Sequence, residues 1–168
     1  MSTPSRHAWV TDLRDSPVEQ RRAAAQRLAE MDPVPAESTL ALVDAVSDAD
    51  EEVRQWSSDA LEKLAAPEVQ AVSDLAQRLE HGPPDVAYWS ATLLGRLQGA
   101  SERAVPALAR AIEHHGTLAV RERAAWALGQ IGPAAQTVRD VLQRAADGNS
   151  PRLARLARAA LAQMPDSP

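Results

Sequence analysis

Residues 120–132 read VRERAAWALGQIG, and this stretch decides the fold. Its first, fifth, ninth and twelfth positions are apolar: Val120, Ala124, Leu128 and Ile131. This spacing places the four side chains along one stripe of an α-helix, because one turn takes about 3.6 residues. The pair Gly132-Pro133 then ends the helical pattern. The stretch therefore predicts an amphipathic helix with one buried face.

The same pattern occurs five times along the 168 residues. The copies begin at Gln20, Val53, Val86, Val120 and Leu153, so the period is 33 or 34 residues. The ninth position is leucine in every copy, and the fifth is always alanine or serine. A small residue at the fifth position lets a neighbouring helix come close. A repeat of this length indicates an array of stacked helical units.

A shorter apolar stripe lies before each copy, for example Val105, Leu108 and Ile112, or Val69, Val72, Leu75 and Leu79. We expect these stripes to form the first helix of each pair. The connections are short, so successive helices should be antiparallel neighbours. The sequence thus predicts an all-α protein, an α-solenoid of about five antiparallel helical hairpins in a single domain spanning 1–168. The second helices are expected near 17–31, 51–65, 84–98, 118–131 and 151–164.

Residues at the predicted helix starts support these boundaries. Asp50 stands where a side chain caps the helix that begins near residue 51. Ser16 and Glu19 have the spacing of a capping box for the helix near 17–31. Gly95 and Gly129 lie inside predicted helices, where glycine costs about 1 kcal/mol relative to alanine. They predict either close helix packing or open access for a partner.

The segment from Val120 to Gly132 resembles the second helix of a HEAT repeat, of the short type named after phycobilisome (bilin) lyases. It matches the pattern V-R-x-x-A-A-x-A-L-G-x-I-G at every fixed position. The copy at Val53 matches in part through Arg54, Ala60 and Leu61. The resemblance covers nearly the whole chain and implies a helical solenoid. It leaves the function open, because such repeats serve scaffolds, enzyme adaptors and lyases.

Two other repeat classes share a similar period. Tetratricopeptide repeats place bulky aromatic residues at fixed positions, whereas this chain has no Phe and one Tyr. Ankyrin repeats carry a T-P-L-H turn, which this sequence lacks. Both classes therefore remain alternatives that the composition disfavours.

The sequence offers little for catalysis. Cysteine is absent, which excludes a thiolate metal site and a Cys nucleophile, and the seven glycines form no phosphate-binding loop. The adjacent His114 and His115 point to different sides of a helix, so we expect them to mark a helix C-terminus. The HEAT-like family includes a di-iron hydroxylase with His-Glu pairs, but here the order is Glu80-His81 and Glu113-His114. We expect no metal, no cofactor and no enzymatic activity.

The charge and hydropathy of the chain limit the classes of partner that it is expected to bind. The net charge is −5, which argues against a protein that wraps nucleic acid. No apolar run reaches the roughly 20 residues of a membrane helix, and residues 1–10 lack the apolar core of a secretory signal. We therefore expect a cytoplasmic protein with no membrane contact. Acidic residues gather at 48–52, where they either steer a basic partner or form a solvated helix start.

The face of the second helices opposite the core stripe is the predicted concave surface. Six residues on it are candidates for binding a partner: Trp126, Tyr88, Glu122, Arg22, Asp59 and Arg155. Aromatic residues flanked by charge are common anchors of an interface. Trp126 has a second interpretation, in which it folds over Gly95 or Gly129 and fills space between helices.

These patterns favour a non-enzymatic scaffold or adaptor that binds another protein, of unknown identity, on the concave face. The bilin-lyase resemblance implies an alternative, an accessory subunit of a lyase or other modifying enzyme. A nucleic-acid-binding module is the third hypothesis, because Arg152, Arg155 and Arg158 give the last helix a basic side.

Overall fold

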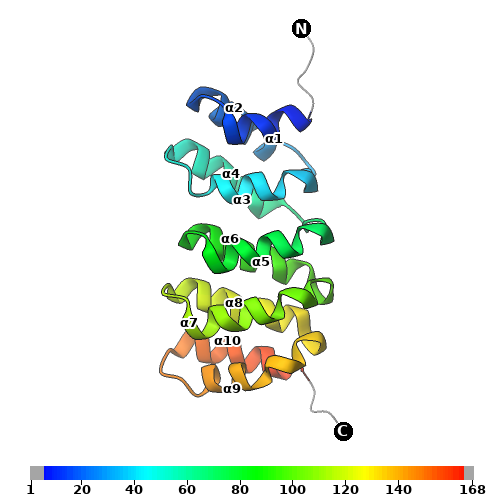
Figure 1. Cartoon of the computed structure of the whole chain (residues 1–168), viewed down its shortest axis with the longest axis vertical. Helices are drawn as coiled ribbons and strands as arrows, with labels where there is room; N and C mark the ends of the chain where they lie inside the picture. Colours follow the sequence, from blue (N-terminus) through cyan, green and yellow to red (C-terminus); the bar gives the residue numbers. More distant parts are fainter. Residues whose placement is uncertain (1–5, 165–168) are drawn as a thin grey trace. The chain divides into compact units, whose positions relative to one another are not determined.

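The computed structural model describes residues 6–164, with side chains from Ala8 onward. All regular elements in this range are helices, and none of them is long and apolar enough to cross a membrane (Figure 1). The contacts divide the chain into two compact units, residues 1–68 and 69–168. The single domain expected from the sequence stays a prediction.

Residues 6–68 of the first unit form four α-helices and one short 3₁₀ turn. In chain order these are α1 (Arg6–Asp15), α2 (Val18–Ala29), η1 (Ala36–Ser38), α3 (Thr39–Ala45) and α4 (Glu51–Lys63). Helix α2 packs on α4, and α1 and α3 pack on these second helices and on each other. Leu28, Leu42 and Leu61 are fully buried at the centre of the unit.

The second unit repeats the same plan three times. Its elements are η2 (Val69–Ala71), α5 (Val72–His81), α6 (Pro84–Arg96), η3 (Gln98–Ala104), α7 (Val105–His114), α8 (Leu118–Ile131), η4 (Gly132–Val138), α9 (Arg139–Ala146) and α10 (Pro151–Ala162). Helices α6, α8 and α10 contact one another in series, and so do α5, α7 and α9 (Figure 1). The unit therefore has two layers, one of first helices and one of second helices.

The helix starts agree with the sequence at some positions and differ at others. The five expected second helices are α2, α4, α6, α8 and α10, each inside its expected range. Asp50 is the N-cap of α4 and its carboxylate accepts a hydrogen bond from the Val53 amide at 3.2 Å. The capping box at Ser16 is wrong, because Pro17 intervenes before α2 and the Ser16 hydroxyl donates instead to Asp12 at 3.2 Å.

Val69 is a second correction. The sequence places it on the buried stripe of a first helix, but 54% of it is exposed. It begins the 3₁₀ turn η2, which changes direction before α5 starts at Val72. The residues that follow on the stripe, Val72, Leu75 and Leu79, are buried as expected.

An arginine at the second position of three repeats donates to a backbone carbonyl that precedes its own second helix. Arg21 donates to the Ser16 carbonyl at 3.0 Å, Arg54 to the Asp48 carbonyl at 2.8 Å and Arg121 to the Ile112 carbonyl at 2.7 Å. Carbonyls at the C-terminus of a helix lack partners within that helix. Arg121 supplies this partner to Ile112 in the last turn of α7, whereas Ser16 and Asp48 lie in the connections before α2 and α4.

Small residues bring the second helices of the second unit together. A Cβ added to Gly95 would lie 3.1 Å from the Ala127 Cα, and one added to Gly129 would lie 3.1 Å from the Ala160 Cα. Both distances are shorter than ordinary contacts, so a side chain at either position would force the neighbouring helix to shift. Close helix packing is thus the reason for both glycines.

Candidate protein-interaction face

A hollow of about 260 Å³ opens on the layer of second helices in the second unit. It is lined by Tyr88 of α6, by Ala119, Glu122, Arg123 and Trp126 of α8, and by Arg152 and Leu156 of α10. Three of the six residues expected to bind a partner thus meet in one place: Tyr88, Glu122 and Trp126. Their common position follows from the contacts of α8 with both α6 and α10.

Arg123 contacts both aromatic side chains of this hollow. Its guanidinium carbon lies 4.5 Å from the centre of the Tyr88 ring and 5.1 Å from that of the Trp126 ring. It also donates a hydrogen bond to the Tyr88 hydroxyl. The negative ring faces attract the cation and restrict its side chain. The group is therefore positioned before any partner arrives.

Trp126 has a packing role in addition to its place in the hollow. A Cβ at Gly95 would lie 3.0 Å from the Trp126 Cε3 atom, so the indole covers the glycine directly. The residue is half-buried and still lines the hollow. The interpretation that it fills space over Gly95 is confirmed, and its use as an anchor for a partner stays a prediction.

Glu122 is less open than the sequence implies. Only 8% of the residue is exposed, and its carboxylate pairs with Arg152 at 3.3 Å. It is buried because α8 contacts a helix on each side, α6 and α10. The charge of Glu122 is therefore compensated by Arg152. Arg123, in contrast, pairs with no carboxylate of the described residues.

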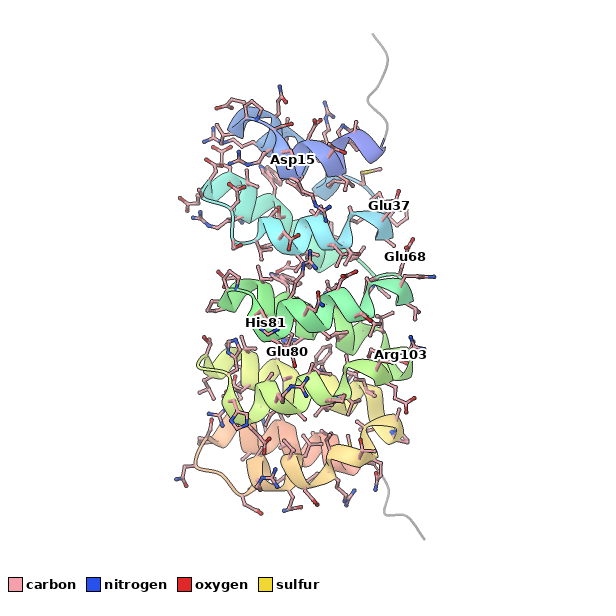
Figure 2. The ribbon with its side chains drawn as sticks, in the orientation of Figure 1. Asp15, Glu37, Glu68, Glu80, His81 and Arg103 are labelled. Carbon is pink, nitrogen blue, oxygen red and sulfur yellow. The ribbon has the colours of Figure 1, made fainter. Side chains whose placement is uncertain are left out.

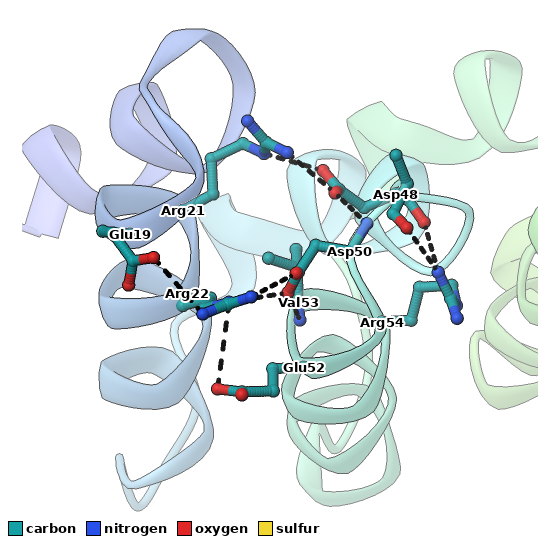
Figure 3. Close-up of polar contacts among 9 residues, drawn as sticks. Glu19, Arg21, Arg22, Asp48, Asp50, Glu52, Val53 and Arg54 are labelled. Atoms are coloured by element: carbon teal, nitrogen blue, oxygen red, sulfur yellow. Dashed lines mark hydrogen bonds and ion pairs between the residues drawn. The ribbon is translucent and has the colours of Figure 1, made fainter.

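The other three expected residues lie elsewhere. Arg155 is exposed on α10 and does not line the hollow. Asp59 lies half-buried on α4 in the first unit, and Arg22 lies on α2. Arg22 is engaged in an ion pair with Asp50, whose carboxylate is 2.6 Å from its Nη2 atom (Figure 3). We conclude that Arg22 contributes to the structure of the first unit.

The acidic cluster at residues 48–52 is partly neutralised within the same unit (Figure 3). Arg21 contacts Asp48 at 2.8 Å, and the Asp50 amide donates to Asp48 at 2.8 Å. Arg22 lowers the pKa of Asp50 to about 2 through its hydrogen bond, against the opposing effect of burial. Burial by itself raises the pKa of Asp48, but the hydrogen bonds from Arg21 and Asp50 reverse this and leave that pKa below its ordinary value. Two of the four acids are thus fixed helix-start groups.

The histidines are placed at helix ends. Glu80 and His81 lie in the last turn of α5, where Arg110 of α7 pairs with Glu80 (Figure 2). The His115 Nδ1 atom accepts a hydrogen bond from the Thr117 amide at 3.1 Å, just before α8. No group of three or more potential metal ligands occurs among residues 6–164 as far as they are described. The absence of metal, cofactor and catalysis stays a prediction.

Four residues that line the hollow were not among those expected to bind a partner: Ala119, Arg123, Arg152 and Leu156. Arg123 and Leu156 occupy the fourth position of their repeats. The six expected residues come from the third and seventh positions. A signal was available, because Arg123 stands one turn before Trp126 and one repeat plus one residue after Tyr88. Residues so spaced become neighbours when consecutive second helices pack side by side.

Solved structures resemble the chain over most of its length. A designed armadillo repeat protein in complex with the peptide (KR)4 has a TM-score of 0.66 at 17% identity, covering 94% of this chain and 80% of that one. The complex of CpcE and CpcF of phycocyanin lyase from Nostoc sp. PCC7120 has a TM-score of 0.65 at 23% identity, covering 98% and 66%. An engineered protein has a TM-score of 0.60 at 20% identity, covering 96% and 79%.

These likenesses show the fold, an all-α repeat solenoid. No curated protein matches the sequence. A family model described as HEAT repeats matches residues 72–162, which is more than half of the chain. The chain therefore belongs to the HEAT repeat family.

Proposed function

We propose that this protein is a non-enzymatic adaptor that holds another protein on the face formed by α6, α8 and α10. The observation that carries the proposal is the stack of Tyr88, Arg123 and Trp126 beside an open hollow. Tyrosine, tryptophan and arginine are the residues most enriched among the energetic anchors of protein interfaces. The cytoplasmic location expected from the sequence is part of the same proposal.

The fold supports this assignment. Repeat solenoids present a continuous layer of helices, which suits them to extended binding surfaces. The designed armadillo neighbour is in complex with the peptide (KR)4. In the present chain Arg123 is restrained by two ring contacts and a hydrogen bond, which reduces the entropy lost when a partner binds.

The test is capture from an extract of the native cell with the immobilised full chain. We expect a defined protein to be retained by the wild-type chain and lost from Trp126→Ala. The matched control is Arg103→Ala, an exposed residue of η3 outside the hollow, which should retain the same protein. Far-UV circular dichroism must show equal helicity for both variants. Equal retention by all three chains would contradict the proposed face.

A second candidate is an accessory subunit of a lyase or similar modifying enzyme. The likeness to the phycocyanin lyase complex, which covers 98% of this chain, favours it. A chain of that kind is expected to carry a coloured or small-molecule ligand when purified from its native source. A visible absorption band that disappears on denaturation would support this candidate over the adaptor, and a colourless protein that captures a partner would exclude it.

A further inference from the structure

We propose that the hollow on α6, α8 and α10 recognises an acidic peptide segment in which a carboxylate side chain binds Arg123 and an adjoining apolar side chain covers Leu156. This inference rests on the proposed adaptor function and adds the chemistry of the partner.

The first step is the state of Arg123. A guanidinium carries five N–H donors, and the Tyr88 hydroxyl is the acceptor that the structure provides in the hollow. The guanidinium carbon lies over both rings and one N–H group donates to the Tyr88 hydroxyl, so the other N–H groups are left for a ligand. A planar edge with parallel N–H groups matches a carboxylate in a bidentate arrangement.

The second step is the charge balance of the hollow. Its lining contains two arginines and one glutamate, and that glutamate is taken by Arg152 at 3.3 Å. Arg155 adds an exposed cation on the same helix as Arg152. The hollow is therefore a net cationic site in a chain whose net charge is −5. A basic segment would meet an uncompensated like charge at Arg123, whereas an acidic one would neutralise it.

The third step is the size and lining of the site. A volume of about 260 Å³ is below the range of small-molecule pockets, about 300–1,000 Å³, and suits one or two side chains of a peptide. Leu156, Ala119 and the indole of Trp126 supply an apolar wall. A carboxylate beside an apolar residue satisfies both parts of this lining.

Nucleic acid is a poorer match for the same site. Binding to a phosphate backbone draws on many cations, whereas this hollow offers one uncompensated arginine and contains a carboxylate. A single-stranded oligonucleotide is therefore included in the test as an alternative ligand.

The experiment measures fluorescence anisotropy of labelled peptides with the full chain. The probes are acetylated and amidated octapeptides of alternating Glu-Leu, Gln-Leu and Lys-Leu, so that only side chains carry charge. We expect the Glu-Leu peptide to bind at least about tenfold more tightly than the Gln-Leu peptide, because a hydrogen bond between charged groups is lost. Its affinity should fall as salt is raised.

The variants locate the effect. Arg123→Gln should weaken the Glu-Leu peptide at least about tenfold and leave the Gln-Leu peptide unchanged, whereas Arg103→Gln should alter neither. Arg123→Lys keeps the charge but loses the planar edge, and should weaken binding by a smaller factor. If Arg123→Gln loses helicity, the role of Arg123 can still be tested with Arg123→Lys, which keeps the positive charge.

Equal binding of the Glu-Leu and Gln-Leu peptides would overturn the inference, as would tighter binding of the Lys-Leu peptide. So would a single-stranded oligonucleotide that binds through Arg123 when the Glu-Leu peptide does not. If the Lys-Leu peptide binds and this binding depends on Trp126, the inference of an acidic partner is wrong, but the proposed adaptor function is still supported. Failure of every peptide would also overturn the inference, while capture from native extract would still decide the adaptor function.

Discussion

The indole of Trp126 lies directly over Gly95, where an added Cβ would sit 3.0 Å from the ring atom Cε3 and closer still to Cζ3. The crossing of α6 and α8 therefore depends on the absence of a side chain at position 95.

This relationship predicts the effect of Gly95→Ala. Alanine favours the helix by about 1 kcal/mol, whereas overpacking costs about 1–3 kcal/mol. The new methyl would also press on the Ala127 backbone, 3.1 Å away, which cannot rotate aside. We expect a net loss of about 1 kcal/mol in the free energy of unfolding, measured by urea denaturation. Gly99→Ala, where a Cβ meets nothing within 4 Å, is the control and should show no loss.

Replacing a buried serine is expected to stabilise the fold, in contrast to Gly95→Ala. The hydroxyls of Ser57 and Ser90 are buried and have no hydrogen-bond partner in the described part of the chain. A buried unsatisfied polar group costs about 1–3 kcal/mol, and the same repeat position is alanine in three other copies. Ser90→Ala should therefore raise the free energy of unfolding by about 1 kcal/mol. Ser73→Ala, an exposed helix position, should change it little, and a destabilised Ser90→Ala would refute the assignment.

The ion pair of Arg22 with Asp50 predicts a pH dependence. The pKa of Asp50 is lowered to about 2 in the folded state, so the unfolded chain takes up this proton first as the pH falls. The stabilisation is complete above the ordinary pKa of about 4 and is lost as the pH falls toward 2. Asp50→Asn keeps a capping side chain but removes the charge. Its urea midpoint should lie below that of the wild type at pH 5, and the gap should narrow toward pH 2.

A gap that stays constant with pH would show that the loss in Asp50→Asn comes from the cap and not from the ion pair.

The hydrogen bond of Arg121 links α7 and α8, and its contribution to the free energy of unfolding can be predicted. Its Nε atom donates to the Ile112 carbonyl at 2.7 Å, inside the last turn of α7. Arg121→Ala should cost about 1–3 kcal/mol, because a hydrogen bond from a charged group is lost and the carbonyl is left without it. Arg155→Ala on the exposed side of α10 should stay within about 0.5 kcal/mol. Thermal unfolding followed by circular dichroism separates the two.

Most of the helix layout could be predicted because its signal is periodic. A stripe such as Val120, Ala124, Leu128 and Ile131 reports burial through spacing alone, and all four are buried. The helix starts were harder to predict, since the Ser16 hydroxyl could either accept from the Glu19 amide or donate to Asp12. Pro17, which is the N-cap of α2, leaves Ser16 outside the cap, and its hydroxyl donates to Asp12.

The candidate site could be predicted only in part. Tyr88 and Trp126 could be predicted because their repeat positions lie on the face of the second helices opposite the core stripe. Arg123 was missed because its role depends on the side chain of another repeat, and a linear pattern does not report which of several arginines stacks on a ring. The burial of Glu122 likewise follows from contacts that α8 makes with its neighbours.

The most direct test of the binding face is the indole N–H signal of Trp126 in the nuclear magnetic resonance spectrum of the labelled full chain, titrated with the Glu-Leu octapeptide. We predict a saturable shift of this signal, while the indole signal of Trp56 on α4 stays in place. A Trp126 signal that does not move while the peptide binds, or a Trp56 signal that moves as far, would contradict a partner site on α6, α8 and α10.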